Sequence, residues 1–306
     1  EQTENQSLNN SNEPQTKPLW KKDAPSLRKY QQQIYERATK EDLLVVIPTG
    51  LGKTYIAARL AAHVLAQNPN SFAFILAPTR PLISQHLKSL KEVIDLPEEK
   101  FKLLTGKVSP GKRAKFYFED GPAVVLMTPQ TFWNDVKKER IGLKKASLVV
   151  FDEAHRARGR YAYCRVADAY RRVRTGEPQV IEEEEDCSEV ESGGNDQNSA
   201  SNQESTNIVK ENQQLTPQFG RVLALTASPG ASKSKIEITC HNLHVPSDNI
   251  EFRDKKSKSV KKYAHETEVL HVPVHMTDTM KKIHSALTEV KHDVLLQYIQ
   301  KLAEFD

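Results

Sequence analysis

The chain has few cysteines and no long apolar run, and both absences narrow its class. Its three cysteines, Cys164, Cys187 and Cys240, stand far apart in 306 residues, and their spacing fits no metal site. No apolar run approaches the roughly 18 residues that a bilayer-spanning helix needs, and the polar N-terminus lacks the apolar core of a signal peptide. We therefore expect a soluble, intracellular protein with reduced thiols and no membrane partner.

Hydrophobic residues are also scarce, at 38% of the chain, which predicts that part of its length does not fold. Residues 1–22 are rich in Asn, Gln, Ser and Glu, so we expect a disordered tail with Trp20 as its candidate docking residue. Residues 176–218 contain eleven acidic residues and one lysine. We expect this stretch to be a disordered acidic insertion that serves as a spacer, a protein-docking segment or a mimic of DNA.

The distribution of charge suggests a polyanionic partner. The acidic stretch carries a net charge of −10, so the rest of the chain carries +14 against the total of +4. Basic residues cluster at Lys112, Arg113 and Lys115, and again from Arg156 to Arg160. Each cluster alone is typical of a solvated face, but a body with this excess of positive charge attracts nucleic acid.

Helical and strand patterns alternate along most of the chain. Strands that alternate with helices of ten to fifteen residues predict βαβ crossovers and a parallel α/β sheet covered by helices on both faces. The expected strands are 43–47, 72–76, 101–104, 123–127, 148–151, the run from 220, and 266–274. The expected helices are 27–39, 53–66, 81–94, 110–118, 130–138, 161–173, 232–243 and an amphipathic one over 280–298.

The sequence VVIPTGLGKT at 45–54 has the pattern of a phosphate-binding loop between a strand and a helix. Gly50 and Gly52 let backbone N–H groups surround phosphate oxygens, Lys53 reaches the β- and γ-phosphates, and Thr54 ligates Mg²⁺. The general pattern has glycine where this chain has Ile47, which argues against a GTPase-like or ABC-like loop and favours the tighter loop of helicase motors.

A second acidic motif follows a second apolar strand, in LVVFDEAH at 148–155. Asp152 is the expected Mg²⁺ ligand, and Glu153 is the expected base that orients and deprotonates water. The carboxyl ends of parallel strands meet at one edge of a sheet, so the two motifs are expected to hold ATP and Mg²⁺ together.

With these motifs in order, the chain resembles the first RecA-like motor domain of superfamily 2 DEAH helicases, within the group of archaeal Hef and the Fanconi anaemia M translocase. The resemblance covers about 27–243 without the acidic insertion. The motifs that carry it are PTGLGKT at 48–54, LAPTRPLISQH at 76–86, LLTG at 103–106, MTPQT at 127–131, FDEAHRARGRYAY at 151–163 and LTASPG at 225–230.

The resemblance implies roles for further residues. Arg28, Tyr30 and Gln31 would seat and read adenine, with Thr49 and Leu51 completing the phosphate loop. His155 would act with the catalytic acids and hydrogen-bond towards Thr226 and Ser228, which would couple ATP to the nucleic-acid surface. The residues expected to contact the phosphates of one DNA strand are Thr79, Arg80, Gly106, Thr128 and Gln130. Thr79 and Thr128 could instead cap helices, and Phe132 and Trp133 are expected in the core.

These motifs divide the chain into a tail at 1–22, a motor domain at 23–250 and a segment at 251–306 that would begin a helical insertion domain. The family's second RecA-like domain, which would supply an arginine finger, lies outside these residues, so we expect this piece to bind ATP weakly and hydrolyse it poorly. The implied activity is an ATP-dependent DNA helicase or translocase acting on branched or forked DNA, in the nucleus if the source is eukaryotic and in the cytoplasm or nucleoid if it is archaeal. A repair protein could dock on the acidic insertion.

Two other functions stay open at this point. The lobe could be a non-catalytic DNA-binding or recruitment module, although such a module has no reason to keep Lys53, Asp152, Glu153 and Thr226 together. It could also be an RNA-dependent ATPase resembling Dicer or innate-immune sensors. Those proteins usually carry cysteine where this chain has Ala154.

Overall fold

The structure is a computed structural model that describes residues 18–119, 121–179, 220–227, 233–263 and 272–303. The chain divides into two compact units, one ending at Ala264 and the other beginning at His265. The first unit holds every motif identified above, and the described part of the second holds one helix.

A single sheet of seven parallel strands organises the first unit, in the order β3-β4-β2-β5-β6-β1-β7. Every residue of β1, β2, β4 and β5 is buried, which explains why β1, β2, β4 and the 148–151 part of β5 are continuous apolar runs and not alternating ones. The strands are β1 (Leu43–Val46), β2 (Phe72–Leu76), β3 (Phe101–Leu104), β4 (Ala123–Met127), β5 (Ala146–Asp152), β6 (Arg221–Thr226) and β7 (Ile250–Phe252). The predicted parallel α/β sheet is therefore confirmed.

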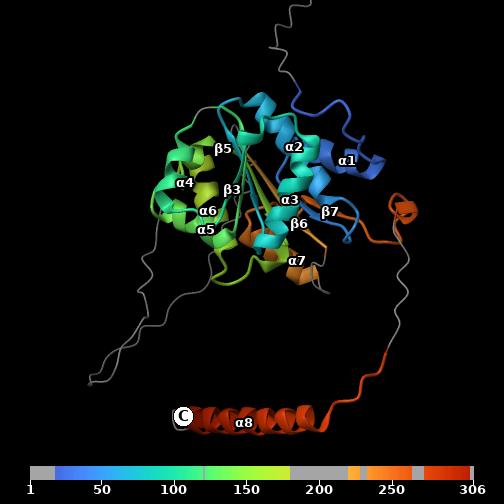
Figure 1. Cartoon of the computed structure of the whole chain (residues 1–306), viewed down its shortest axis with the longest axis vertical. Coiled ribbons are helices and arrows are strands. Elements are labelled where there is room, and N and C mark those ends of the chain that lie inside the picture. Colours follow the sequence, from blue (N-terminus) through green and yellow to red (C-terminus); the bar gives the residue numbers. More distant parts are fainter. Residues whose placement is uncertain (1–17, 120, 180–219, 228–232, 264–271, 304–306) are drawn as a thin grey trace, which may run out of the picture. The chain divides into compact units, whose positions relative to one another are not determined.

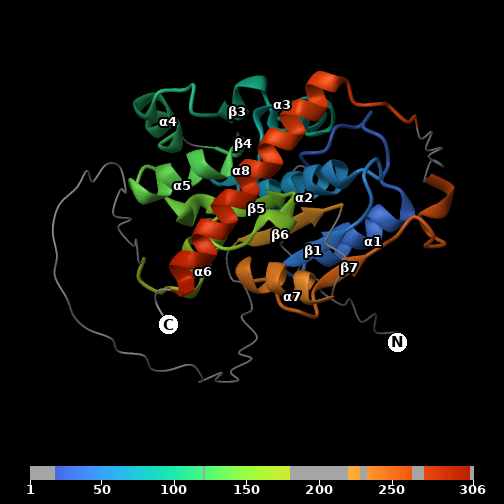
Figure 2. The same ribbon diagram turned by 90° about the horizontal axis from the view of Figure 1, so that it is seen from below.

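Helices cover both faces of this sheet (Figures 1 and 2). On β4, Val124 and Leu126 point into the core shared with α1, α2 and α3, whereas Val125 and Met127 point into the core shared with α4, α5, α6 and α7. The helices are α1 (Lys29–Ala38), α2 (Lys53–Gln67), α3 (Arg80–Val93), α4 (Pro110–Tyr117), α5 (Pro129–Lys137), α6 (Ala162–Thr175) and α7 (Lys233–Asn242), with short 3₁₀ helices η1 (Glu98–Lys100), η2 (Leu143–Lys145), η3 (Ala154–Arg156) and η4 (Lys261–Tyr263).

The last strand of the sheet was not predicted. β7 pairs with β1 along only three residues, and Glu251 in its middle breaks any apolar pattern. The Arg37 side chain secures this edge by donating hydrogen bonds to the carbonyls of Ile250 and Asp248 and pairing with the Glu251 carboxylate. These contacts hold β7, which follows the boundary expected at 250, within the first compact unit. Residues 272–274 of the strand expected at 266–274 are not in a strand, and 266–271 lie outside the described residues.

The described end of the N-terminal segment packs on the first unit. Trp20 forms an antiparallel bridge with Ile94, and its ring lies edge-on to Tyr55 at 5.9 Å. The Arg59 guanidinium lies 5.0 Å from the centre of the same ring, a cation–π geometry. The docking expected of Trp20 is confirmed, while residues 1–17 of the expected tail and 180–218 of the acidic insertion lie outside the described residues.

The second unit contains α8 (Asp278–Ala303), which includes the predicted amphipathic helix. Ile283, Leu287 and Val290 recur at the predicted spacing, and each is more than half exposed within this unit. Among the described residues, no helix combines the length and the apolarity that a membrane span needs.

Candidate nucleotide and nucleic-acid site

The predicted motifs meet at the carboxyl edge of the sheet. The phosphate loop follows β1, the DEAH motif follows β5, and β6 lies between these two strands. Asp152 at the end of β5 is in register with Leu225, and Val46 at the end of β1 is in register with Thr226. The segments after β2, β3 and β4 occupy the other half of the same edge. One edge therefore carries a nucleotide half and a nucleic-acid half.

Glycine is required at the centre of the phosphate loop. Gly52 has φ +76°, in the left-handed region, and a Cβ there would lie 2.4 Å from the Gln31 amide nitrogen. Gly50 also has a positive φ, of +82°. Helix α2 begins directly after Gly52 at Lys53, so its N-terminal N–H groups and the positive end of its dipole face the loop, as an anion site needs.

The residues expected at adenine divide into two groups. Tyr30 is completely buried, and its hydroxyl donates to the Leu51 carbonyl over 2.6 Å, so it supports the loop from behind. Gln31 donates to the same carbonyl over 3.2 Å and accepts from the backbone N–H of Arg28 over 2.9 Å. Only the Arg28 side chain lies outside the core, with its guanidinium 4.3 Å from the centre of the Tyr263 ring. No sequence pattern marked Tyr263, because only the tertiary fold brings its ring to Arg28, 235 residues earlier in the chain.

Lys53 lies within electrostatic reach of both DEAH acids. Its ammonium donates to the Ile47 carbonyl over 3.2 Å. Burial lowers the pKa of Lys53, and the negative charges of Asp152 and Glu153 partly oppose this shift. The charge of the loop lysine is therefore coupled to that of both carboxylates.

Thr54 and Asp152, the two expected Mg²⁺ ligands, are linked through one histidine ring. His86 lies on α3, with its Nδ1 3.1 Å from the Thr54 hydroxyl and its Nε2 2.7 Å from a carboxylate oxygen of Asp152. The described residues contain no cluster of three or more His, Cys, Asp or Glu side chains that could hold a metal. One carboxylate and one hydroxyl nevertheless fit Mg²⁺ bound together with ATP, since this ion takes most of its oxygen ligands from phosphates and water.

Glu153 and His155 continue the site towards β6. Glu153 has φ +52°, which is unusual for a residue with a side chain and points to a functional constraint. The Nδ1 atom of His155 lies 3.3 Å from the Glu153 carboxylate and 3.0 Å from the Thr226 hydroxyl. The hydrogen bond predicted between His155 and Thr226 is therefore present, whereas Ser228 lies outside the described residues.

A buried tyrosine fixes the end of β5. The Tyr163 hydroxyl lies 2.6 Å from the Asp152 carbonyl and 2.9 Å from the Leu76 carbonyl at the end of β2. Burial raises the pKa of Tyr163 well above 10, so the hydroxyl keeps the proton that it donates. The last residue of the YAY sequence is thus a structural clamp between the nucleotide half and the nucleic-acid half of the edge.

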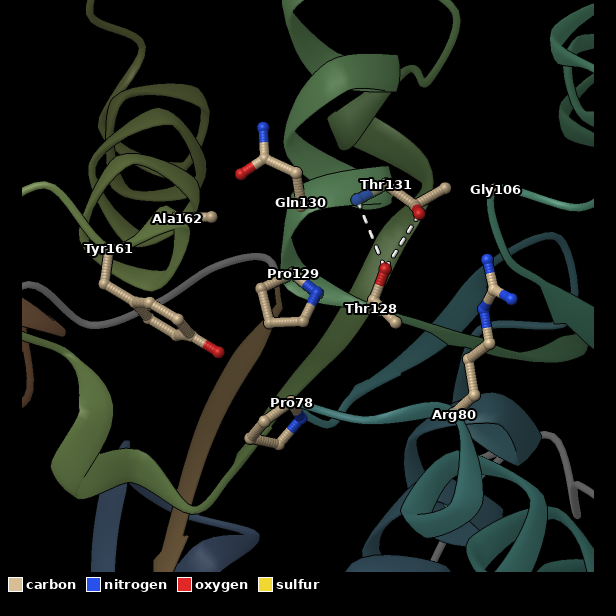
Figure 3. Close-up of a pocket in the computed structure, with 9 residues that line it drawn as sticks. All are labelled: Pro78, Arg80, Gly106, Thr128, Pro129, Gln130, Thr131, Tyr161 and Ala162. Carbon is tan, nitrogen blue, oxygen red and sulfur yellow. Dashed lines mark hydrogen bonds between the residues drawn. The ribbon is translucent and has the colours of Figure 1, made fainter. Parts of the chain in front are cut away.

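A pocket of about 400 Å³ lies in the nucleic-acid half. It is lined by Pro78, Arg80, Gly106, Thr128, Pro129, Gln130, Thr131, Tyr161 and Ala162. Figure 3 shows Arg80 on one side, reaching towards Gly106, and Tyr161 on the opposite side, with Thr128 and Pro129 between them. Four of the five residues expected at DNA phosphates thus converge, while Thr79 is not in the lining and precedes α3 as its N-cap. Tyr161 stands in the YAY sequence, but no pocket contact was predicted for it, because its spacing does not separate it from a core tyrosine.

Some expected contacts have a structural role instead. The Thr128 side chain accepts from the backbone N–H of Thr131 and so caps α5, although it also lines the pocket. Phe132 and Trp133 are buried in the core, as expected. Arg113, which was counted in a candidate basic patch, is only 5% exposed and pairs with the buried Asp135, so it is not available to a phosphate.

We expect Lys53→Met to raise the melting temperature or leave it unchanged while nucleotide affinity falls. The pKa of Lys53 is lowered, so burying its charge costs more than the nearby acids return. With the folded pKa below the unfolded one, this cost is fully present below the folded pKa and disappears as the pH rises through the unfolded value near 10.5. Thermal melts at two pH values with fluorescent-nucleotide titrations test this, and a clear loss of stability at neutral pH would contradict it.

The sequence is similar to those of known proteins. The model of the DEAD/DEAH box helicase family matches residues 28–234. The chain is 32% identical over 251 residues to the ATP-dependent DNA helicase mph1 of Sclerotinia sclerotiorum, covering 82% of this chain and 16% of that protein. It is 29% identical over 278 residues to the DEAD-box ATP-dependent DNA helicase Fancm of Drosophila melanogaster, covering 90% of this chain and 16% of that protein.

A solved structure of another helicase domain has a similar fold. The helicase domain of Pyrococcus furiosus Hef superposes with a TM-score of 0.60 at 34% identity, over 79% of this chain and 41% of that chain. The chain therefore spans less than half the length of each of these proteins. The family match covers more than two thirds of the chain, including the phosphate loop and the DEAH motif, so the chain belongs to the DEAD/DEAH box helicases.

Proposed function

We propose that this chain is the first lobe of an ATP-driven motor that moves along DNA. The observation that carries the proposal is the shared edge of the sheet, where the phosphate loop and DEAH motif lie beside a pocket lined by Arg80 and backbone-rich segments. An enzyme that converts ATP hydrolysis into movement needs both sites on one rigid element. Here β2 and β5 are neighbours, and Tyr163 fastens their ends.

Each residue of the nucleotide half then has a role. The loop from Thr49 to Gly52 surrounds the phosphates with backbone N–H groups, and Lys53 neutralises their charge. Thr54 and Asp152 would hold Mg²⁺, which would supply positive charge at the phosphates, and Glu153 accepts a proton from the attacking water. Arg28 positions adenine, Gln31 holds the loop through the Leu51 carbonyl, and His155 relays the state of the phosphates to Thr226.

In the nucleic-acid half, we propose that one strand lies across the pocket and contacts the protein through its phosphates. Arg80 and Gln130 offer side-chain donors, and the turns at Gly106 and Thr128 offer backbone donors. Such contacts hold a strand without reading its sequence. Burial raises the pKa of Tyr161, so its hydroxyl remains a donor at the opposite wall.

The relatives' names favour DNA as the track, because the Sclerotinia and Drosophila proteins are both described as DNA helicases. We propose branched or forked DNA as the substrate, a role in repair at replication forks, and action wherever the cell keeps its DNA. A second RecA-like domain of the parent protein would close over the ATP, and a repair protein could bind residues 176–218.

Steady-state ATPase assays on the parent protein test the proposal. We expect forked DNA to stimulate turnover more than linear DNA or double-stranded RNA at one fixed salt concentration. We expect Lys53→Ala to abolish the stimulated turnover. Equal turnover in Lys53→Ala would mean that the lobe binds DNA without powering movement, and stronger stimulation by RNA would identify an RNA-dependent ATPase.

Arg80→Ala should weaken DNA binding by a similar factor on every sequence tested. The variant loses one phosphate contact, so the slope of log affinity against log salt should fall by about 1. Fluorescence anisotropy across a salt series measures both quantities. Lys40→Ala is the matched control, because Lys40 lies between α1 and the start of β1, at the opposite edge of the sheet. An unchanged slope in Arg80→Ala would remove this residue from the interface.

A further inference from the structure

Helix α3 places one imidazole between the two expected Mg²⁺ ligands. His86 and Asp152 are 8% and 5% exposed, so their contact is almost fully shielded from water. Both ring nitrogens are engaged, Nε2 by an Asp152 oxygen at 2.7 Å and Nδ1 by the Thr54 hydroxyl at 3.1 Å. The three side chains come from three separate segments, α2, α3 and β5, so the ring fixes their relative positions.

The chemistry of the three groups sets the direction of each hydrogen bond. A carboxylate can only accept, so the ring donates to Asp152 from Nε2–H. In the neutral ring Nδ1 is then an acceptor, and the Thr54 hydroxyl donates its proton to it. With the ring neutral, the hydroxyl proton points at His86, and both lone pairs of the Thr54 oxygen are left for another partner. The second oxygen of Asp152 is free of this bond as well.

This is the orientation that two Mg²⁺ ligands need. A hydroxyl can present a lone pair to a cation only when its proton points away, and a carboxylate holds a metal or its water best when its other oxygen is anchored. We propose that His86 is a positioning residue that sets the orientation of Thr54 and Asp152 for Mg²⁺. The proposal rests on the function proposed above, in which these two residues hold the ion.

Magnesium-dependent nucleotide binding separates this role from a structural one. In the parent protein, a fluorescent non-hydrolysable ATP analogue is titrated first in EDTA and then with increasing Mg²⁺. We expect His86→Ala to raise the half-saturating Mg²⁺ concentration about 10- to 100-fold, the usual effect of losing a group that orients metal ligands. Binding in EDTA should not change, because it depends on the loop and Lys53. His86→Gln should restore much of the Mg²⁺ affinity, since an amide offers one donor and one acceptor.

Two controls keep the result interpretable. His63→Ala removes a half-buried histidine from α2 that bonds Tyr35 instead of the site, and it should leave the Mg²⁺ dependence unchanged. His86→Leu fills the space without hydrogen bonds. If His86→Ala does not fold, His86→Leu should show the rise in half-saturating Mg²⁺ concentration expected for alanine. An unchanged Mg²⁺ dependence in folded His86→Ala or His86→Leu would overturn the proposal, and so would tighter Mg²⁺ binding, which would mean that the ring competes with the ion. Failure of the unaltered protein to bind the analogue would instead reject the proposed function.

Discussion

Glu153→Gln is expected to slow ATP hydrolysis by about 10²- to 10⁴-fold while leaving ATP binding unchanged. The amide keeps the size of the side chain but has no basic oxygen that can take a proton from water. The position is suited to this test, because Glu153 is held at φ +52° by the turn that follows, where the N–H of Arg156 donates to its carbonyl. This hydrogen bond does not involve the carboxylate, so the backbone should not change.

Single-turnover hydrolysis with excess parent protein measures the chemical step, and fluorescent-nucleotide binding measures affinity separately. Glu98→Gln is the matched control, since Glu98 is an exposed acid on η1 that pairs with Lys91 away from the site. Hydrolysis at the normal rate in Glu153→Gln would exclude this residue as the base. A large loss of affinity together with the slower rate would instead mean that the carboxylate also helps to place the nucleotide.

Asp135→Ala should lower the free energy of unfolding by about 3–5 kcal/mol, the effect expected for removing one partner from a buried ion pair. Asp135 is 0% exposed, and its carboxylate accepts from two guanidinium nitrogens of Arg113, at 2.6 and 2.7 Å. It also accepts from Arg140 at 3.0 Å and from the Tyr117 hydroxyl at 3.1 Å. The alanine variant would leave these donors buried or half-buried without their acceptor.

Urea unfolding measures the loss directly, and the corresponding fall in melting temperature is about 10 °C for a domain of this size. Asp168→Ala is the matched control, because Asp168 forms a partly exposed ion pair with Arg172 that should contribute less than about 1 kcal/mol. A loss below 1 kcal/mol in Asp135→Ala would mean that the ion pair of Asp135 and Arg113 contributes no more to the free energy of unfolding than apolar side chains would. Because the network joins α4 to α5, whose first turn lines the pocket, we also expect the variant to bind DNA less well.

Local motifs explain why much of the nucleotide half could be predicted. The loop needs glycines at left-handed positions, and Gly50 and Gly52 have positive φ. The DEAH acids had to follow a buried strand, and Asp152 ends β5. Each of these conditions is met within about ten consecutive residues, so it could be predicted from the sequence without knowledge of the rest of the fold.

Residues that act across the sheet could not be found in this way. Arg113 belonged to a basic cluster in the sequence, yet it is buried against an aspartate 22 residues away. His86 ends a motif associated with nucleic-acid contact, yet its ring faces the nucleotide half. Tyr161 and Tyr263 offer no pattern distinct from that of core tyrosines, and only packing brings them to the pocket and to Arg28.

The sequence by itself determined the alternation of strands and helices, the chemistry of the phosphate loop and the acids at the end of β5, because apolar periodicity, glycine freedom and charge act over a few neighbouring residues. The tertiary structure decided which side chains meet: that β6 lies between the two nucleotide motifs, that Tyr163 clamps β2 to β5, and that His86 joins Thr54 to Asp152. Strand order and helix packing depend on the free energy of burying the whole core. That free energy is a sum over many residues distant in sequence, so no short segment of the chain reveals it.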